Sequence, residues 1–211
     1  MKIYACLLAL ALSFNVSAAT MDASIAQLQH EWATANYQIP EKDRQAALEK
    51  LVKEAHQVTL ANPGRAEPLI WEGIITSTLA KYQSLFSAGG TAKAARDLLL
   101  AAEKINPDAL EGSALTSLGS LYYKVPRFGS FGDYDKARDY LERALKVNPN
   151  GIDQNYFYAD FLLERGEYAK SLEYFRKALN APARPGREDA DAGRRADIKI
   201  GIQKAEKKLQ N

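Results

Sequence analysis

The stretch that best predicts the fold is residues 115–149, which read LTSLGSLYYKVPRFGSFGDYDKARDYLERALKVNP. Its apolar side chains recur every three or four residues on both sides of a central loop, the spacing of an amphipathic helix. Pro149 closes the second half, because proline disfavours the helical region for the residue before it. Gly119, Ala137 and Ala144 are small residues that let helix backbones approach closely. We therefore expect a helical hairpin here.

The ending of this hairpin occurs three times along the chain. An Asn-Pro pair follows an apolar helical pattern at 62–63, at 106–107 and at 148–149. The three pairs are nearly equally spaced, and each marks the end of a unit of about forty residues. A stop signal that repeats at near-constant spacing predicts a stacked array of helix pairs.

The apolar spacing predicts helices through most of the chain outside its first residues. In the second and third units, two inner loops are expected between the paired helices, at 87–91 around Gly89-Gly90 and at 124–133. Residue types that favour helix starts mark several boundaries. The expected helices cover 24–37, Pro40 to about 62, 67–86, 92–105, 109–123, 134–147, 153–165, 167–180 and 196–209, with caps at Thr91, Asp108, Asp133 and Asp153 and a capping box at Ser24 and Gln27.

The residues of the third and fourth units together resemble the tetratricopeptide repeat signature. The resemblance implies a right-handed, all-α solenoid of helical hairpins that serves as a scaffold for protein–protein interaction. Both expected inner loops are longer than this repeat normally allows. The residues that carry the resemblance are Leu115, Leu118, Gly119, Tyr122, Ala137, Leu141, Ala144 and Pro149, then Tyr158, Ala159, Leu162, Gly166, Ser171, Phe175 and Ala178.

A fainter resemblance covers the loop of the third unit and the helix after it. Residues 122–133, continuing into Lys136 and Ala137, look like the corresponding segment in periplasmic tetratricopeptide partners of TRAP-type transporters. That resemblance implies a transporter solute-binding protein as partner. It also implies an alternative function, that of a transport-accessory or small-ligand-binding protein.

The first residues have the composition of an export signal. Lys2 precedes an apolar run from Ile3 to Phe14, and small residues at 17–19 suit signal cleavage. We expect 1–19 to be removed and the rest to be secreted across the inner membrane, to the periplasm, without stable membrane insertion. A retained anchor is the alternative. Cys6, the single cysteine, lies in the removed segment, so no thiol chemistry is expected in the remainder.

The remainder of the chain divides into three parts. Residues 20–63 are expected to form an N-terminal helical hairpin, and 64–181 the repeats. Residues 182–211 comprise a connector rich in proline and arginine, followed by a C-terminal capping helix. A helix in that position covers the last repeat with its apolar stripe. The charges of this final part alternate in sign, and we expect them to be solvated.

Composition argues against several function classes. The chain has 28 basic and 26 acidic residues, so no excess of positive charge would attract nucleic acid. Its two histidines, His30 and His56, lack a second histidine at ligand spacing, and neither a metal site nor a cofactor site is expected. Gly89-Gly90 lacks the residues of a phosphate-binding loop. We therefore expect a protein that is not an enzyme and that binds another protein or peptide.

The candidate partner-binding residues lie on two features of the predicted solenoid. One is the part of the inner loop from Pro126 to Asp133, whose aromatic residues could tuck under the neighbouring inserted loop or face a partner. We expect this loop and the Gly89-Gly90 loop to lie on one edge. The other is the concave side, where the two tyrosines could equally be core residues. The candidates are Tyr123, Arg127, Phe128, Phe131, Tyr156 and Asp160.

Overall fold

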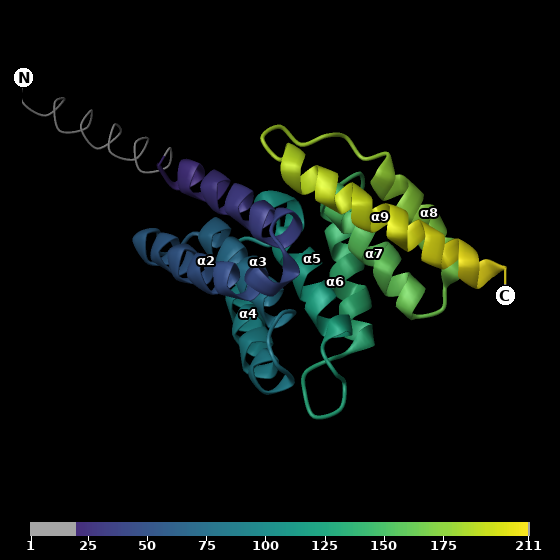
Figure 1. Ribbon diagram of the computed structural model, residues 1–211, viewed down its shortest axis with the longest axis horizontal. Helices are drawn as coiled ribbons and strands as arrows, with labels where there is room; N and C mark the ends of the chain where they lie inside the picture. The colour runs from purple at the N-terminus through teal and green to yellow at the C-terminus, as the bar shows by residue number, and fades with distance from the viewer. Residues whose placement is uncertain (1–19, 211) are drawn as a thin grey trace, which may run out of the picture.

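The computed structural model describes residues 20–210, which fold as helices joined by short connections (Figure 1). The first helical segment covers 20–33 and continues into a π-helical turn, η1 (Thr34–Gln38). None of the helices within the described residues is long and apolar enough to cross a membrane. The predicted signal peptide lies outside the described residues. The helices that follow η1 are α2 (Glu41–Ala61), α3 (Ala66–Ala80), α4 (Leu85–Ile105), α5 (Ala109–Lys124), α6 (Tyr134–Val147), α7 (Ile152–Glu164), α8 (Tyr168–Leu179) and α9 (Glu188–Leu209).

Consecutive helices pack as hairpins, and the hairpins stack side by side. The pairs are α3 with α4, α5 with α6, and α7 with α8 (Figure 1). The first helices of neighbouring pairs also touch, because α5 contacts both α3 and α7. The C-terminal helix α9 packs on α8 and α7, as the first helix of another pair would. The predicted all-α solenoid of helical hairpins is confirmed.

The three Asn-Pro pairs end helices as the sequence predicts. Asn62, Asn106 and Asn148 are the C-cap residues of α2, α4 and α6. The backbone N–H of Asn106 still donates to the Ala102 carbonyl at 2.9 Å, so the last turn closes before the chain leaves the helix. All three asparagines have negative φ, from −129° to −156°. Proline after each of them favours this extended backbone and stops the helix.

Close packing between α5 and α6 depends on Gly119. A Cβ at this position would lie 2.6 Å from Cγ of Leu141 and 3.2 Å from the Leu141 backbone nitrogen. Leu141 is fully buried, and its neighbours leave it no room to move aside. The glycine within α5 is therefore explained by the approach of α6.

We expect Gly119→Ala to lower the free energy of unfolding by about 1–3 kcal/mol, because the added methyl overpacks the contact with Leu141. Urea denaturation followed by circular dichroism measures the change. Gly89→Ala is the matched control. Gly89 lies in α4 with open space around its Cα, so the same substitution should be neutral or stabilising by up to about 1 kcal/mol. Equal effects at both positions would contradict the packing argument.

The loop predicted around Gly89-Gly90 is wrong, because these glycines lie inside the first turns of α4. Helix α3 ends at Ala80, and α4 begins at Leu85 after a short turn. Ser84 is the actual N-cap residue, and its carbonyl accepts from the backbone N–H of Ala88 at 2.9 Å. Glycine costs about 1 kcal/mol in a helix, and the continuing backbone hydrogen bonds offset that preference. The extra length of the second unit is therefore helical.

Some predicted helix starts also require correction. Asp133 caps α6, since its side chain accepts from the N–H groups of the second and third residues after it. Thr91 instead lies within α4, and Asp153 lies in the first turn of α7 after the N-cap Gly151. Ser24 does not start a helix, because its hydroxyl donates to the Thr20 carbonyl one turn earlier. Helix α9 begins eight residues before the predicted start, at Glu188.

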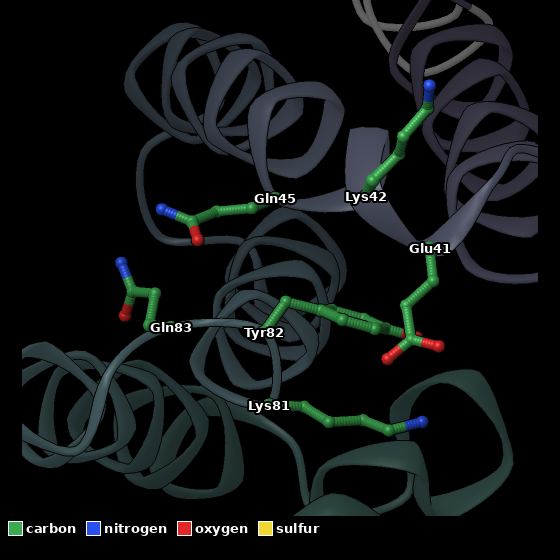
Figure 2. Close-up of a pocket in the computed structure, with 6 residues that line it drawn as sticks. All are labelled: Glu41, Lys42, Gln45, Lys81, Tyr82 and Gln83. Carbon is green, nitrogen blue, oxygen red and sulfur yellow. The ribbon is translucent and has the colours of Figure 1, made fainter.

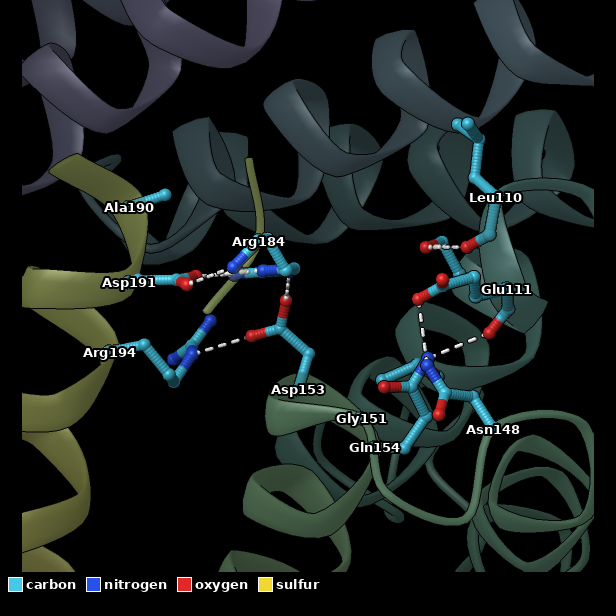
Figure 3. Close-up of polar contacts among 12 residues, drawn as sticks. Leu110, Glu111, Asn148, Gly151, Asp153, Gln154, Arg184, Ala190, Asp191 and Arg194 are labelled. Atoms are coloured by element: carbon cyan, nitrogen blue, oxygen red, sulfur yellow. Dashed lines mark hydrogen bonds and ion pairs between the residues drawn. The ribbon is translucent and has the colours of Figure 1, made fainter. Parts of the chain in front are cut away.

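The turn that opens α5 was not predicted from the sequence. Leu110, Glu111 and Gly112 have φ values of 48°, 57° and 72°, so three successive residues form a left-handed turn. Such a conformation costs roughly 1–3 kcal/mol at a non-glycine residue. Side chains from the end of α6 and from α7 hold it: Asn148 donates to the Glu111 carboxylate and Gln154 donates to the Glu111 carbonyl, each at 2.7 Å (Figure 3).

Candidate protein-interaction surface

The loop of residues 126–133 connects α5 to α6, and its base is fixed. The backbone N–H of Asp133 donates to the Tyr122 carbonyl at 2.8 Å, which draws the two ends of the loop together. A Cβ at Gly132 would overlap the carbonyl oxygen of Val125, so this crossing requires glycine. The sequence therefore builds a closed base from which the tip of the loop projects.

The two phenylalanines of the 126–133 loop have different environments. Phe131 is half-buried and packs edge-on against Tyr122, with ring centroids 5.8 Å apart. The guanidinium of Arg96, from α4, lies 4.6 Å from the centroid of the Phe131 ring. Phe128 is 100% exposed. Phe131 thus ties the loop to the solenoid, and Phe128 presents an apolar ring to solvent.

A shallow hollow lies beside Phe128, at the start of α6. Its central ring is Tyr134, and the guanidinium carbons of Arg127 and Arg165 lie 4.8 Å and 4.4 Å from the ring centroid. Neither guanidinium forms an ion pair within residues 20–210, so both keep donors for another molecule. The residues that line the hollow are Arg127, Phe128, Gly132, Asp133, Tyr134, Asp135 and Arg165.

Two candidates from the concave side, Tyr123 and Asp160, contact each other. The Tyr123 hydroxyl donates to the Asp160 carboxylate at 2.8 Å, and the tyrosine is 3% exposed. Burial, with Asp160 beside it, raises the pKa of Tyr123 well above its ordinary value. Lys124 reaches the same carboxylate at 2.8 Å and Glu164 at 3.3 Å. Burial works against the charge of Lys124, but these two carboxylates raise its pKa.

This group continues to the hollow beside Phe128. Glu164, which pairs with Lys124, also accepts from the Tyr134 hydroxyl at 3.3 Å. Polar groups therefore run from Tyr123 across α7 to Tyr134 without a break. The structure thus links Tyr123 and Asp160 to the loop that carries Phe128.

Tyr156 lies apart from that loop, against α9. Its half-buried ring lies 4.3 Å from the guanidinium carbon of Arg194, which also covers Phe157 at 4.8 Å. Burial raises the pKa of Tyr156 to about 12, although the charge of Arg194 opposes the shift. One face of the Tyr156 ring is therefore covered by Arg194.

Arg194 belongs to a buried ionic network that joins α7 to the C-terminal segment (Figure 3). Asp153 accepts from Arg184 and from Arg194, each at 2.7 Å. Asp191 pairs with Arg184 at 2.6 Å, and Asp197 pairs with Arg194 at 3.2 Å. Arg194 and Asp191 are only 7% and 4% exposed. The prediction that the charges of this segment are solvated is therefore wrong for these residues, because α9 packs them against α7.

A second hollow lies where the start of α2 meets the turn between α3 and α4 (Figure 2). Tyr82 is held there, because Arg44 donates to its hydroxyl at 3.0 Å and Lys81 lies over its ring. The lining mixes both signs of charge and has no exposed aromatic ring like Phe128. It consists of Glu41, Lys42, Gln45, Lys81, Tyr82 and Gln83.

Tyr134 and Arg165 are parts of the candidate surface that sequence reasoning missed. Arg165 ends α7 and Tyr134 begins α6, so thirty residues of chain separate two groups that touch in space. Each resembles an ordinary exposed helix-end residue in the sequence. Only the packing of α6 against α7 brings them together.

Comparison with known proteins supports the repeat architecture. A family model described as tetratricopeptide repeat matches residues 124–188, from the end of α5 to the start of α9. A comparison with curated proteins finds no match. These findings give no support to the fainter resemblance to partners of TRAP-type transporters. The matched residues contain α6 and the α7–α8 hairpin, so this part of the chain is similar to tetratricopeptide repeats in both sequence and helix arrangement.

Proposed function

We propose that the protein is an exported scaffold that binds a partner protein through the 126–133 loop and the hollow beside it. The observation that carries this proposal is Phe128, whose large apolar ring is entirely exposed at the tip of an anchored loop. Scattered exposed apolar residues are ordinary, but this one stands next to a hollow lined by an aromatic ring and two free guanidinium groups.

The chemistry of the hollow indicates what the partner presents. Tyrosine and arginine are the residue types most often found at the energetic centre of protein interfaces. Arg127 and Arg165 offer donors in a planar arrangement that suits a carboxylate. A partner segment with an apolar side chain beside an aspartate or glutamate would cover Phe128 and pair with these arginines.

Export is supported by the first residues alone. A positive start, an apolar run and small residues form the pattern of a secretion signal in 1–19. A periplasmic location remains part of the proposal, as does the absence of catalysis. The alternative function, accessory to a transporter solute-binding protein, stays a prediction from the fainter resemblance.

Site-specific crosslinking tests the scaffold proposal. A photo-crosslinking residue at position 128 should capture one protein in cells, and the same probe at Leu60 should not. Leu60 is also a well-exposed apolar residue, 62% exposed, but it lies on α2. The captured protein is then purified so that its affinity for variants can be measured.

We expect Phe128→Ser to weaken binding of that protein by about 30-fold, as loss of a central interface residue does. The melting temperature should not change, because the ring makes no buried contact. Leu60→Ser is the control and should keep the affinity of the unchanged protein. If Phe128→Ser binds the purified partner as tightly as Leu60→Ser does, the proposed docking surface is wrong.

A further inference from the structure

Arg187 differs from the other arginines of the C-terminal segment. It is the N-cap residue of α9 and is half-buried. Arg184 and Arg194, which lie near it in sequence, are paired with carboxylates at 2.6–3.2 Å. The Arg187 guanidinium has no ion pair within the described chain, and its buried Nε has no hydrogen-bond partner. It therefore carries a charge and donors that the protein itself leaves unsatisfied.

Within residues 20–210, the ring beside Arg187 is the indole of Trp71, from α3. The guanidinium carbon lies 5.1 Å from the ring centroid. Trp71 is 4% exposed, and its buried Nε1 also has no partner among the described residues. Trp32, the other tryptophan, donates its indole N–H to the Thr78 hydroxyl at 2.9 Å. Two unsatisfied donors thus come from side chains in contact, and each costs about 1–3 kcal/mol while it stays buried without a partner.

These donors lie where the start of α9 packs against the N-terminal helical segment and α3. We call this contact the seam. Helix α9 contacts the N-terminal helical segment through Asp189 and His30, at 2.6 Å, and η1 through Asp197 and the Tyr37 hydroxyl, at 3.2 Å. Ala190 is buried in the same core as Trp71. On the other side, the residues that precede Arg187 are exposed, including Gly186 with open space around it. Arg187 therefore lies at the border between this buried contact and the exposed connector.

We propose that Arg187 and Trp71 form a binding site for a carboxylate, which enters the seam and accepts hydrogen bonds from the guanidinium and the indole N–H. A carboxylate has two oxygens, one for each orphan donor, and its negative charge supplies the partner that Arg187 lacks. The site is formed by α3 and the start of α9 and shares no residue with the surface around Phe128, so it does not depend on the proposed function.

The surroundings favour a carboxylate over a doubly charged anion. Asp153, Asp189 and Asp191 all lie close enough to act on the charge of Arg187. A phosphate would bring more negative charge towards these carboxylates. Burial and the neighbouring Arg184 lower the pKa of Arg187, although Asp153, Asp191 and Asp189 oppose the shift. A singly charged carboxylate can pair with Arg187 while it adds the least repulsion with these aspartates.

Nuclear magnetic resonance of the indole N–H groups tests the site directly. The chain has two tryptophans, so the spectrum should show two indole signals. Adding sodium acetate should move the Trp71 signal downfield in a saturable manner, because its N–H gains an acceptor. The Trp32 signal should not move, since its acceptor is already present. Sodium chloride at equal ionic strength should move neither signal.

Arg187→Gln should weaken the acetate response by about 10-fold or more, as expected for loss of a charged hydrogen-bond donor. Arg176→Gln is the matched control: it removes the same charge from an exposed position on α8 and should leave the response unchanged. Circular dichroism verifies that both variants are folded. A Trp71 signal that does not respond, or that responds equally in both variants, overturns the proposal.

Trialanine and its C-terminal amide distinguish the source of the carboxylate. If the free peptide moves the Trp71 signal and the amide does not, the site accepts a peptide terminus as well as a small acid. If acetate alone acts, the site takes small organic acids. Both results support a carboxylate site. An equal response to the amide contradicts it.

Discussion

Asp153→Ala is expected to lower the free energy of unfolding by about 3–5 kcal/mol, the cost of breaking a buried ion pair by removing one partner. Asp153 is the carboxylate that Arg184 and Arg194 share, with both contacts at 2.7 Å. Its loss leaves two guanidinium groups near one another with less negative charge to compensate them. Arg194 has a side chain only 9% exposed, so water cannot replace the missing acceptor. Urea denaturation gives the energy directly.

Asp139→Ala supplies the control for this substitution. Asp139 also pairs with an arginine, Arg143, at 3.5 Å, but its side chain is 66% exposed. Exposed ion pairs contribute about 0–1 kcal/mol, because water and salt screen them. Both substitutions remove an aspartate that pairs with arginine, and they differ in how deeply that aspartate is buried. If the two substitutions cost the same, the network around Asp153 does not hold α9 to α7.

The effect of Asp153→Ala should also depend on pH. Burial alone would raise the pKa of Asp153, but Arg194 and Arg184 outweigh it and lower the pKa well below its ordinary value. A carboxylate with a lowered pKa in the folded state stabilises the protein fully above its unfolded value of about 4, and this contribution is lost as pH falls below that value. The gap in unfolding free energy between the unchanged protein and Asp153→Ala should therefore be widest near neutral pH. It should narrow as the solution is acidified.

Local signals explain why so much of the helical framework could be predicted from the sequence. The Asn-Pro pairs act on the backbone immediately before them, and the spacing of apolar and small residues records which side of a helix is buried. Gly119 is a clear case, because it stands among the small residues of the repeat pattern at the position where α6 approaches α5. The bounds of α5 and α6 were predicted to within a residue for this reason.

Features that depend on contacts across the fold were not predicted. Gly89 and Gly90 suggest a loop because of their conformational freedom, but hydrogen bonds from Ser84 onward keep them helical. The charges before α9 alternate like those of a solvated helix, and nothing local shows that Asp153, about thirty residues earlier, pairs with them. The left-handed turn at Leu110 and Glu111 likewise depends on side chains about forty residues later in the chain, Asn148 and Gln154.

The candidate surface also has one part that local sequence predicts and another that depends on contacts across the fold. The 126–133 loop was singled out because it is longer than the repeat requires and because two aromatic residues alternate there with glycines and serine beside Arg127. Composition could not separate Phe128 from Phe131, since that difference arises from Tyr122 and Arg96, which cover one ring and not the other. The partner-binding role of these residues stays a prediction.

Phe175→Ala should be as damaging as the loss of Asp153, with a decrease of about 3–5 kcal/mol in the free energy of unfolding. Phe175 is fully buried, and its ring fills the space between α7, α8 and α9. The ring also stands against Gly201 of α9, where a Cβ would overlap it. Alanine would leave a cavity at the point where the C-terminal helix joins the last repeat. Phe128→Ala is the control, because that ring is exposed and its removal should change stability by less than about 0.5 kcal/mol.

A double-mutant cycle separates loss of packing at Phe175 from a general effect of changing this helix. Gly201→Ala alone should destabilise the protein by about 1–3 kcal/mol, because the methyl collides with the ring. In the Phe175→Leu background the side chain is smaller, so the same methyl should cost less or even fill part of the space. The coupling free energy should then reach about 0.5–3 kcal/mol, as it does for residues in contact. Additive effects would mean that α9 is not held by this contact, and the ionic network at Asp153 would be left as its main attachment.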